Sequence, residues 1–111
     1  MERARGEIWF VDLSDARGHE QAGIRPAIVL GVSYGGITVV VPLTTTPAAF
    51  QFPHTHCIHS DSRNGLSDDS AALVFQIVAL SEDRFIRKTG HCSDEDMEAI
   101  IILLKDLLSI D

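Results

Sequence analysis

A short stretch near the N-terminus, GHEQAGIRPAIVL at residues 18–30, places several ionisable side chains directly before an apolar run. His19 and Glu20 can each accept or donate a proton, and the ordinary pKa of histidine lies closest to neutral pH. Arg25 carries a guanidinium, whose planar set of N–H donors suits a phosphate group. Together these residue types could serve proton transfer and charge stabilisation at a phosphate. The plainer alternative is a solvated surface ion pair between Glu20 and Arg25, which would do no chemistry.

A second cluster, HTHCIH at residues 54–59, contains the imidazole and thiol groups that commonly bind zinc. In an extended strand, His54 and His56 point to one face, whereas Cys57 and His59 point to the other. The four side chains therefore cannot converge on one ion, and we predict no metal site. Cys57 and Cys92 match no zinc motif and form no disulfide framework, so we expect both to be buried thiols.

The whole chain has the composition of one globular domain. It contains 111 residues, of which 45% are hydrophobic and 23% are charged, so we predict a single ordered domain over residues 1–111. No apolar run approaches the roughly 20 residues of a membrane-spanning helix, and the N-terminus MERARGE lacks the apolar segment of a secretory signal. We therefore expect a cytoplasmic protein with no membrane partner.

The net charge of −7 argues at first against a nucleic-acid partner, because phosphate binding needs positive potential. The charge is unevenly distributed, however. Residues 94–111 contain six acidic residues and one lysine, and so carry a charge of −5. The first 25 residues contain five acidic residues and four arginines, and are close to neutral. The total charge is therefore a poor guide to any one face of the molecule, and it does not exclude RNA.

Several segments have the pattern of β-strands. Residues 7–13 mix aromatic and β-branched residues with polar ones, as half-buried strands do. Residues 26–32 and 37–43 are apolar runs separated by SYGG, whose paired glycines suit a hairpin turn. Residues 55–60 could form another short strand, and residues 71–80 are a further apolar run.

Only the C-terminal segment has a clear helical pattern. Ser93 is a good N-cap, and the three acidic residues after it suit the positive end of a helix dipole. Apolar residues then recur at helical spacing, at Met97, Ile100, Ile101, Leu104 and Leu108. Several short strands with one or two helices predict a mainly β fold, a small barrel or sandwich on which a helix packs. In this fold residues 14–24 form a loop that carries His19 and Glu20.

Five segments of the chain occur in the order and spacing of a known family. They are RGEIWFVDL, GHEQAGIRPAIVL, VVVPLTT, NGLSDDSAALVFQI and GHCSDEDMEAI, and they span nearly the whole chain. The chain thereby resembles the MazF/PemK/Kid toxins. The resemblance implies an SH3-like β-barrel with a C-terminal helix, a homodimer, and a sequence-selective endoribonuclease that cuts single-stranded RNA without a metal or other cofactor. It also implies a cognate antitoxin protein that occupies the RNA groove.

The resemblance further implies catalytic roles for Arg25, Thr44, Glu20 and His19. Metal-free RNA cleavage uses the ribose 2′-hydroxyl as the nucleophile, so a base must remove its proton and a cation must stabilise the phosphorane. Arg25 suits the second role, because arginine is a poor base but a good phosphate ligand. Thr44 can hydrogen-bond a nonbridging oxygen, and either Glu20 or His19 can act as the base. The residues expected to contact RNA are Gln21, Gln76 and His56.

Two of these RNA contacts have a structural alternative. Gln76 could equally be a buried hydrogen-bond anchor, and His56 could belong to an ordinary polar strand face. The chain also departs from the family pattern. Kid-like members have an arginine and an aspartate where this chain has Leu73 and Phe75, and many members have an arginine in place of Val78. A mechanism built on that later arginine and aspartate therefore cannot operate here. The alternatives are a catalytically weakened SH3-like binding module and a gyrase poison like CcdB.

Overall fold

Seven β-strands and one α-helix make up the regular structure of the described residues, which are 3–31 and 33–110 of a computed structural model. The strands are β1 (Glu7–Asp12), β2 (Ile24–Val29), β3 (Ile37–Thr44), β4 (Thr55–Ile58), β5 (Ser70–Leu73), β6 (Val78–Ser81) and β7 (Phe85–His91). Three short 3-10 helices, η1 (Pro47–Gln51), η2 (Val74–Gln76) and η3 (Glu82–Arg84), connect strands, and helix α1 (Asp94–Leu107) follows β7. The prediction of a mainly β fold with a C-terminal helix is confirmed.

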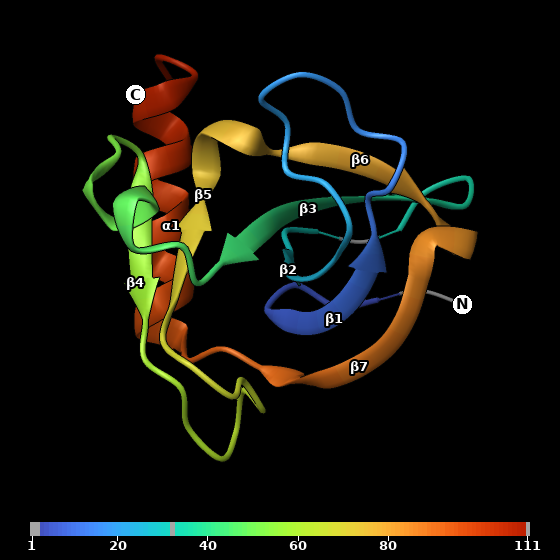
Figure 1. Ribbon diagram of the computed structural model, residues 1–111, viewed down its shortest axis with the longest axis horizontal. Helices are drawn as coiled ribbons and strands as arrows, with labels where there is room; N and C mark the ends of the chain where they lie inside the picture. The colour runs from blue at the N-terminus through green and yellow to red at the C-terminus, as the bar shows by residue number, and fades with distance from the viewer. Residues whose placement is uncertain (1–2, 32, 111) are drawn as a thin grey trace.

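All the strands pair antiparallel in one curled sheet, in the order β4-β5-β3-β2-β1-β7 (Figure 1). Strand β3 is the centre of this sheet. One of its edges pairs with β2, and the other pairs first with β6, along Ile37–Val40, and then with β5, at Leu43 and Thr44. The described residues show no pairing between the two end strands, β4 and β7. The sheet is therefore curled around β3, and its ends are not joined.

The apolar run at residues 71–80 is not one strand. It divides into β5 and β6, with the turn η2 between them, so that both halves pair with successive parts of β3. Its apolar side chains serve different clusters, because Val74 packs with the helix-side core whereas Leu80 packs on the opposite face of the sheet. Apart from Gln76, the residues of this run are apolar on both sides of the bend, so periodicity alone does not divide it into two strands.

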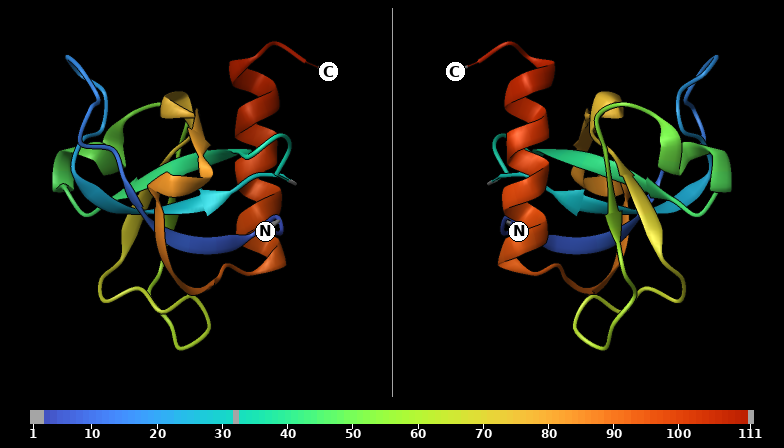
Figure 2. Two further views of the ribbon diagram at one scale, coloured as in Figure 1. Left: turned by 90° about the vertical axis from the view of Figure 1, so that its right-hand side faces the viewer. Right: turned by 90° about the vertical axis from the view of Figure 1, so that its left-hand side faces the viewer.

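The two larger hydrophobic cores lie on the two faces of the sheet, and a third, smaller cluster consists of Ala49, Ala71 and Leu73. The first includes Ile8, Ile28, Val41 and Leu43, and helix α1 covers it with Ile100, which is fully buried. The second consists of Val11, Leu13, Ala27, Val29, Val40 and Leu80. Figure 2 shows α1 on one side of the sheet and the β1–β2 loop on the other. The helix therefore leaves the second face available for the loop and whatever the loop binds.

The predicted helix and hairpin are present. The Ser93 hydroxyl accepts the backbone N–H of Asp96 at 3.1 Å, which is the expected N-cap bond. Strands β2 and β3 form the predicted hairpin, although β2 begins at Ile24, two residues earlier than expected. Strand β7, which pairs with β1, was not predicted, because its sequence FIRKTGH has little apolar content. In the described part of the chain, no helix is long and apolar enough to cross a membrane.

The cysteines differ from one another. Cys92 is buried as expected, and burial raises the pKa of its thiol to about 11. Cys57 is exposed, so the expectation that both thiols are buried is wrong for this residue. The reason is the register of β4, in which Ile58 points into the core and its neighbour Cys57 therefore points outward.

Candidate functional site

A pocket of about 740 Å³ lies where the β1–β2 loop crosses the sheet face opposite α1. The loop contributes Asp15, His19, Glu20 and Gln21 to its wall. The other wall comes from η2, which contributes Phe75 and Gln76, and from β6. The floor includes Pro42 of β3. Three of the residues expected from the sequence on this loop, His19, Glu20 and Gln21, therefore share one cavity with the expected Gln76.

Gln76 connects the two walls of this pocket. Its side-chain oxygen Oε1 accepts the backbone N–H of Gln21 at 2.8 Å, and its Nε2 donates to the backbone oxygen of His19 at 3.0 Å. The carboxamide is thus occupied by the main chain on both sides of Glu20. Gln76 is therefore a hydrogen-bond anchor that is only partly buried and that also lines the pocket, and its contact with RNA stays a prediction.

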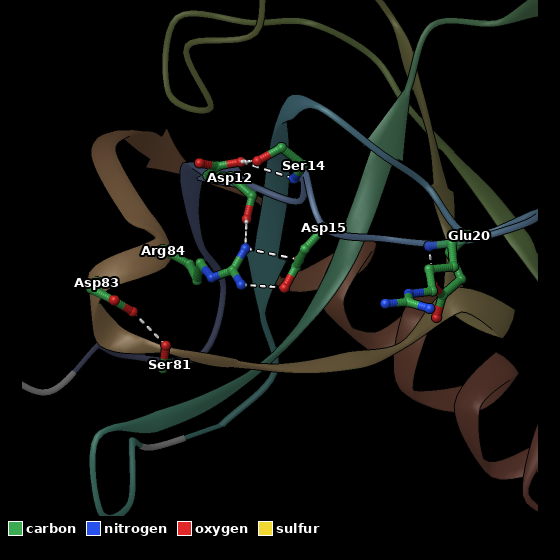
Figure 3. A network of polar contacts seen from close by, with 8 residues as sticks. Asp12, Ser14, Asp15, Glu20, Ser81, Asp83 and Arg84 are labelled. Atoms are coloured by element: carbon green, nitrogen blue, oxygen red, sulfur yellow. Dashed lines mark hydrogen bonds and ion pairs between the residues drawn. The ribbon is translucent and has the colours of Figure 1, made fainter.

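Arg84, at the end of η3, holds the other end of the same loop. Its Nη1 donates to the Asp15 carboxylate at 2.9 Å and to the backbone oxygen of Asp12 at 3.2 Å, while Nη2 bonds the second oxygen of Asp15. Figure 3 shows the guanidinium pointing between these two acceptors, with Glu20 farther along the loop. The hydrogen bond from Arg84 lowers the pKa of Asp15, so this carboxyl remains ionised and the contact stays intact at neutral pH. The sequence contains no sign of this pair, whose members are 69 residues apart.

Glu20 does not form the surface ion pair with Arg25 that the sequence offered as an alternative. Its carboxylate Oε1 accepts the backbone N–H of Arg17 at 2.5 Å, and its own N–H donates to the backbone oxygen of Arg17 at 3.1 Å. This turn fixes Glu20 within the loop. The side chains of Glu20 and His19 are both exposed, and both line the pocket.

Arg25 and Thr44 lie at the ends of neighbouring strands. The pairing of β2 with β3 runs from Val29 opposite Val40 to Ala27 opposite Pro42. Arg25 is two residues before Ala27 and Thr44 is two residues after Pro42, so strand alternation directs both side chains to the sheet face of the pocket. The two residues expected to contact the phosphate therefore share one face of the sheet, although neither lines the pocket itself.

The two side chains differ in accessibility. Arg25 is half-buried, and its Nε donates to the backbone oxygen of Ala22 at 2.6 Å. Its two Nη nitrogens make no hydrogen bond to any of the described residues, so they can serve a phosphate. Thr44 is only 3% exposed, and its hydroxyl donates to the Thr46 hydroxyl at 3.1 Å while accepting the Thr46 N–H at 3.3 Å. A ligand would reach this pair of hydroxyls first at Thr46, which is exposed.

His56 lies away from these residues. Its Nε2 is 2.8 Å from the Asp96 carboxylate of α1, and His54 makes the same kind of contact with Asp106 of that helix. Strand β4 thus turns both imidazoles toward α1, on the opposite side from the pocket. The structure therefore does not bring His56 together with the other expected site residues. The contact of His56 with Asp96 could not have been predicted from the sequence, because the two residues are 40 positions apart.

Residues 4–108 match the family described as PemK-like, MazF-like toxin of type II toxin-antitoxin system. The chain is 32% identical over 100 residues to endoribonuclease EndoA of Bacillus subtilis, covering 86% of this chain and 85% of that protein. It is also 32% identical over 100 residues to endoribonuclease MazF of Staphylococcus saprophyticus, covering 86% of this chain and 82% of that protein.

Solved structures share the fold. MazF of Deinococcus radiodurans superposes with a TM-score of 0.84 at 20% identity, covering 99% of each chain. An endoribonuclease from a Mycobacterial species, solved in complex with its cognate antitoxin, gives a TM-score of 0.73 at 22% identity, covering 98% of this chain and 97% of that one. A MazE-MazF complex of Deinococcus radiodurans gives 0.71 at 18% identity, covering 97% and 95%.

Proposed function

The chain belongs to the PemK-like, MazF-like toxins of type II toxin-antitoxin systems, and from this membership we propose that it is an endoribonuclease that cleaves single-stranded RNA at selected sequences. The observation that carries the proposal is the family match over residues 4–108, which includes the whole β1–β2 loop and both strand ends that carry Arg25 and Thr44. We further propose that the curled sheet is an SH3-like barrel and that the protein acts in the cytoplasm.

The proposed reaction is an attack within the RNA strand. The 2′-hydroxyl oxygen forms a bond to the adjacent phosphorus, and the bond from phosphorus to the 5′-oxygen of the next nucleotide breaks. The products are a 2′,3′-cyclic phosphate and a 5′-hydroxyl. A base must take the 2′-hydroxyl proton, and an acid must protonate the leaving oxygen. Because the nucleophile belongs to the substrate, these steps need no metal ion.

The side chains of the site can be assigned to these steps. The Nη nitrogens of Arg25 stabilise the extra negative charge of the phosphorane. The Thr44 hydroxyl is hydrogen-bonded to the Thr46 hydroxyl and holds it where it can contact a nonbridging oxygen of the phosphorane. Glu20 and His19 remain the two candidates for the base, since the loop presents both at the pocket. The positions of Leu73 and Phe75 hold no group that can transfer a proton, so the proton transfers fall to the loop.

We propose two protein partners. One is a second copy of the chain, because a domain of 111 residues is too small to enclose a long RNA groove by itself. The other is a cognate antitoxin, as in the complexes of the Mycobacterial and Deinococcus proteins. The antitoxin segment would cross Arg25 and thereby exclude RNA. Light scattering at micromolar concentration should give the mass of a dimer, and a monomer would contradict this proposal.

The test of the function is incubation of the purified protein with a long RNA in EDTA. Cleavage by the wild type, and no cleavage by Arg25→Ala, supports the proposal. Arg63→Ala is the matched control, because Arg63 lies in the β4–β5 connection and should leave cleavage unchanged. RNA binding without cleavage would favour the weakened binding module. That alternative rests on Leu73, Phe75 and Val78, which replace charged residues of related toxins. Gyrase inhibition without RNA cleavage would favour the CcdB-like alternative.

A further inference from the structure

We infer that Phe52 and Phe75 form a stacking site for an unpaired RNA base at the edge of the pocket, an inference that rests on the proposed function. The two rings contact one another edge to face, with centroids 6.0 Å apart and an interplanar angle of 73°. Both rings are accessible, since Phe52 is 48% exposed and Phe75 is 39% exposed. Phe75 also lines the pocket, directly beside Gln76. The aromatic pair is therefore continuous with the cavity that contains His19 and Glu20.

Hydrogen bonds fix the main-chain segments that carry the two rings. The Phe52 N–H donates to the Ala49 oxygen at 3.2 Å, and its carbonyl accepts the Thr55 hydroxyl at 2.6 Å. On the other side, the Val74 N–H donates to the His54 oxygen at 3.0 Å and so ties η2 to the segment that carries Phe52. A flat surface that is already ordered binds a base at a lower entropic cost than a mobile side chain does.

Figure 2 shows η1, which Phe52 directly follows, on the same side of the sheet as the β1–β2 loop and opposite α1. The ring pair is thus on the face that the proposed substrate would use.

The charges of the pocket wall favour an uncharged contact with RNA. Its wall contains the carboxylates of Asp15 and Glu20, and one guanidinium, that of Arg84, which is already bound to Asp15. Phosphate attraction at this wall is therefore weak. Stacking on an aromatic ring does not depend on phosphate charge, and aromatic side chains commonly bind single-stranded RNA in this way. Phe75 has no group that can transfer a proton, and we assign it a role in RNA affinity instead.

The experiment first locates a cut site by mapping the cleavage of a long RNA in EDTA. A short RNA that spans this site, with 2′-deoxyribose before the scissile phosphate, then serves as an uncleaved probe. 2-Aminopurine replaces one base of the probe at a time, and its fluorescence should fall on binding at the base that stacks. Phe75→Ala and Phe52→Ala should each weaken binding by roughly tenfold and abolish that quenching.

Matched variants separate stacking from general apolar contact. Phe75→Tyr keeps a flat ring and should bind like the wild type, whereas Phe75→Leu keeps apolar volume and should bind as weakly as Phe75→Ala. Tyr34→Ala removes an aromatic ring that is 87% exposed at the β2–β3 turn, and it should have no effect. In cleavage assays, Phe75→Ala should raise KM and leave the single-turnover rate at saturation close to that of the wild type.

The outcomes distinguish this inference from the proposed function. If the wild type cleaves RNA and Phe75→Ala or Phe75→Leu binds the probe as tightly as the wild type, the stacking site is wrong and the function stands. If the wild type cleaves no RNA, 2-aminopurine is placed in short unpaired RNAs of mixed sequence in place of the mapped probe; quenching that Phe75→Ala abolishes then keeps the stacking site, and the proposed function fails. Loss of antitoxin binding in the variants, with RNA binding unchanged, would show that the rings receive a protein and would overturn the inference.

Discussion

Gln76 accepts the backbone N–H of Gln21 through its side-chain oxygen, across 2.8 Å and 55 residues of sequence. With the second bond of the same carboxamide to the backbone of His19, this contact fixes the part of the loop that presents Glu20 to the pocket. We therefore predict that Gln76 is a positioning residue, which acts on the reaction through the loop.

Gln76→Ala should lower kcat more than it raises KM. Without the two hydrogen bonds of Gln76, the loop holds the proton-accepting side chain, Glu20 or His19, in many positions instead of one. The stability loss should be about 1 kcal/mol, as for a typical hydrogen bond. Hydrogen exchange of the Gln21 amide should become faster, which a residue that only contacts RNA would not cause. Gln51→Ala, which changes an exposed glutamine on η1, is the control. Unchanged exchange at Gln21 would contradict the positioning role.

Arg25→Ala should reduce the single-turnover cleavage rate on the order of a hundredfold or more, by analogy with the loss of an oxyanion donor worth roughly 3 kcal/mol. Arg25→Lys should restore little of this rate, since an ammonium keeps the charge but loses the planar fork. Thermal melting should change little, because the half-buried side chain makes one hydrogen bond to the described residues. A correctly folded and fully active Arg25→Ala would remove Arg25 from the site.

The nucleophile can be tested with the wild-type protein. RNA that carries 2′-deoxyribose just before the scissile phosphate should bind but resist cleavage, since it lacks the attacking hydroxyl. The measurement compares single-turnover cleavage of matched ribo and 2′-deoxy oligonucleotides. Efficient cleavage of the deoxy substrate would refute internal attack.

Thr44→Val should affect both activity and stability. The side chain is buried, and removing its hydroxyl breaks both contacts with Thr46, so unfolding should become easier by about 1 kcal/mol. Cleavage should fall because Thr46 loses its fixed position. Thr44→Ser keeps the hydroxyl and should retain activity, and Thr45→Val, at an exposed neighbour, is the control for substitution at this turn. Wild-type cleavage by Thr44→Val would show that the hydroxyl takes no part.

His59 and Asp69 predict a pH dependence outside the site. Their side chains are 3.0 Å apart, and the hydrogen bond that the Asp69 carboxylate accepts from His59 raises the pKa of His59 and lowers that of Asp69. The pair therefore stabilises the fold between the ordinary pKa values of the two groups. This contribution is lost as pH rises through the raised pKa of His59, and also as pH falls through the lowered pKa of Asp69.

Asp69→Asn should bring the His59 pKa, measured by NMR titration, back toward 6.5. The melting-temperature difference between wild type and this variant should shrink between pH 6 and 8. A difference that grows over this range would have the wrong sign for this pair. His54→Asn, at another histidine of the same segment, should leave the His59 titration unchanged.

The sequence by itself determined the local elements. The hydroxyl of Ser93, the acidic residues after it and the helical spacing of the apolar residues were sufficient to predict α1, because these interactions are made within one segment. The glycines of SYGG predicted the β2–β3 hairpin for the same reason. The sequence also predicted correctly that His19 and Glu20 lie on a loop and that Arg25 lies at the start of a strand. A charged stretch before an apolar run can be buried only in part, so it must lie at the surface where the strand begins.

The tertiary structure decided which distant residues meet. The division of residues 71–80 into β5 and β6 follows from their pairing with two parts of β3, and the apolar sequence is the same on both sides of the bend. His56 contacts Asp96 instead of the pocket because β4 lies beside α1. Gln76 and Arg84 hold the loop, and Phe52 meets Phe75, only because the curled sheet brings these segments together. Such contacts depend on the arrangement of several strands, which no single segment of sequence contains.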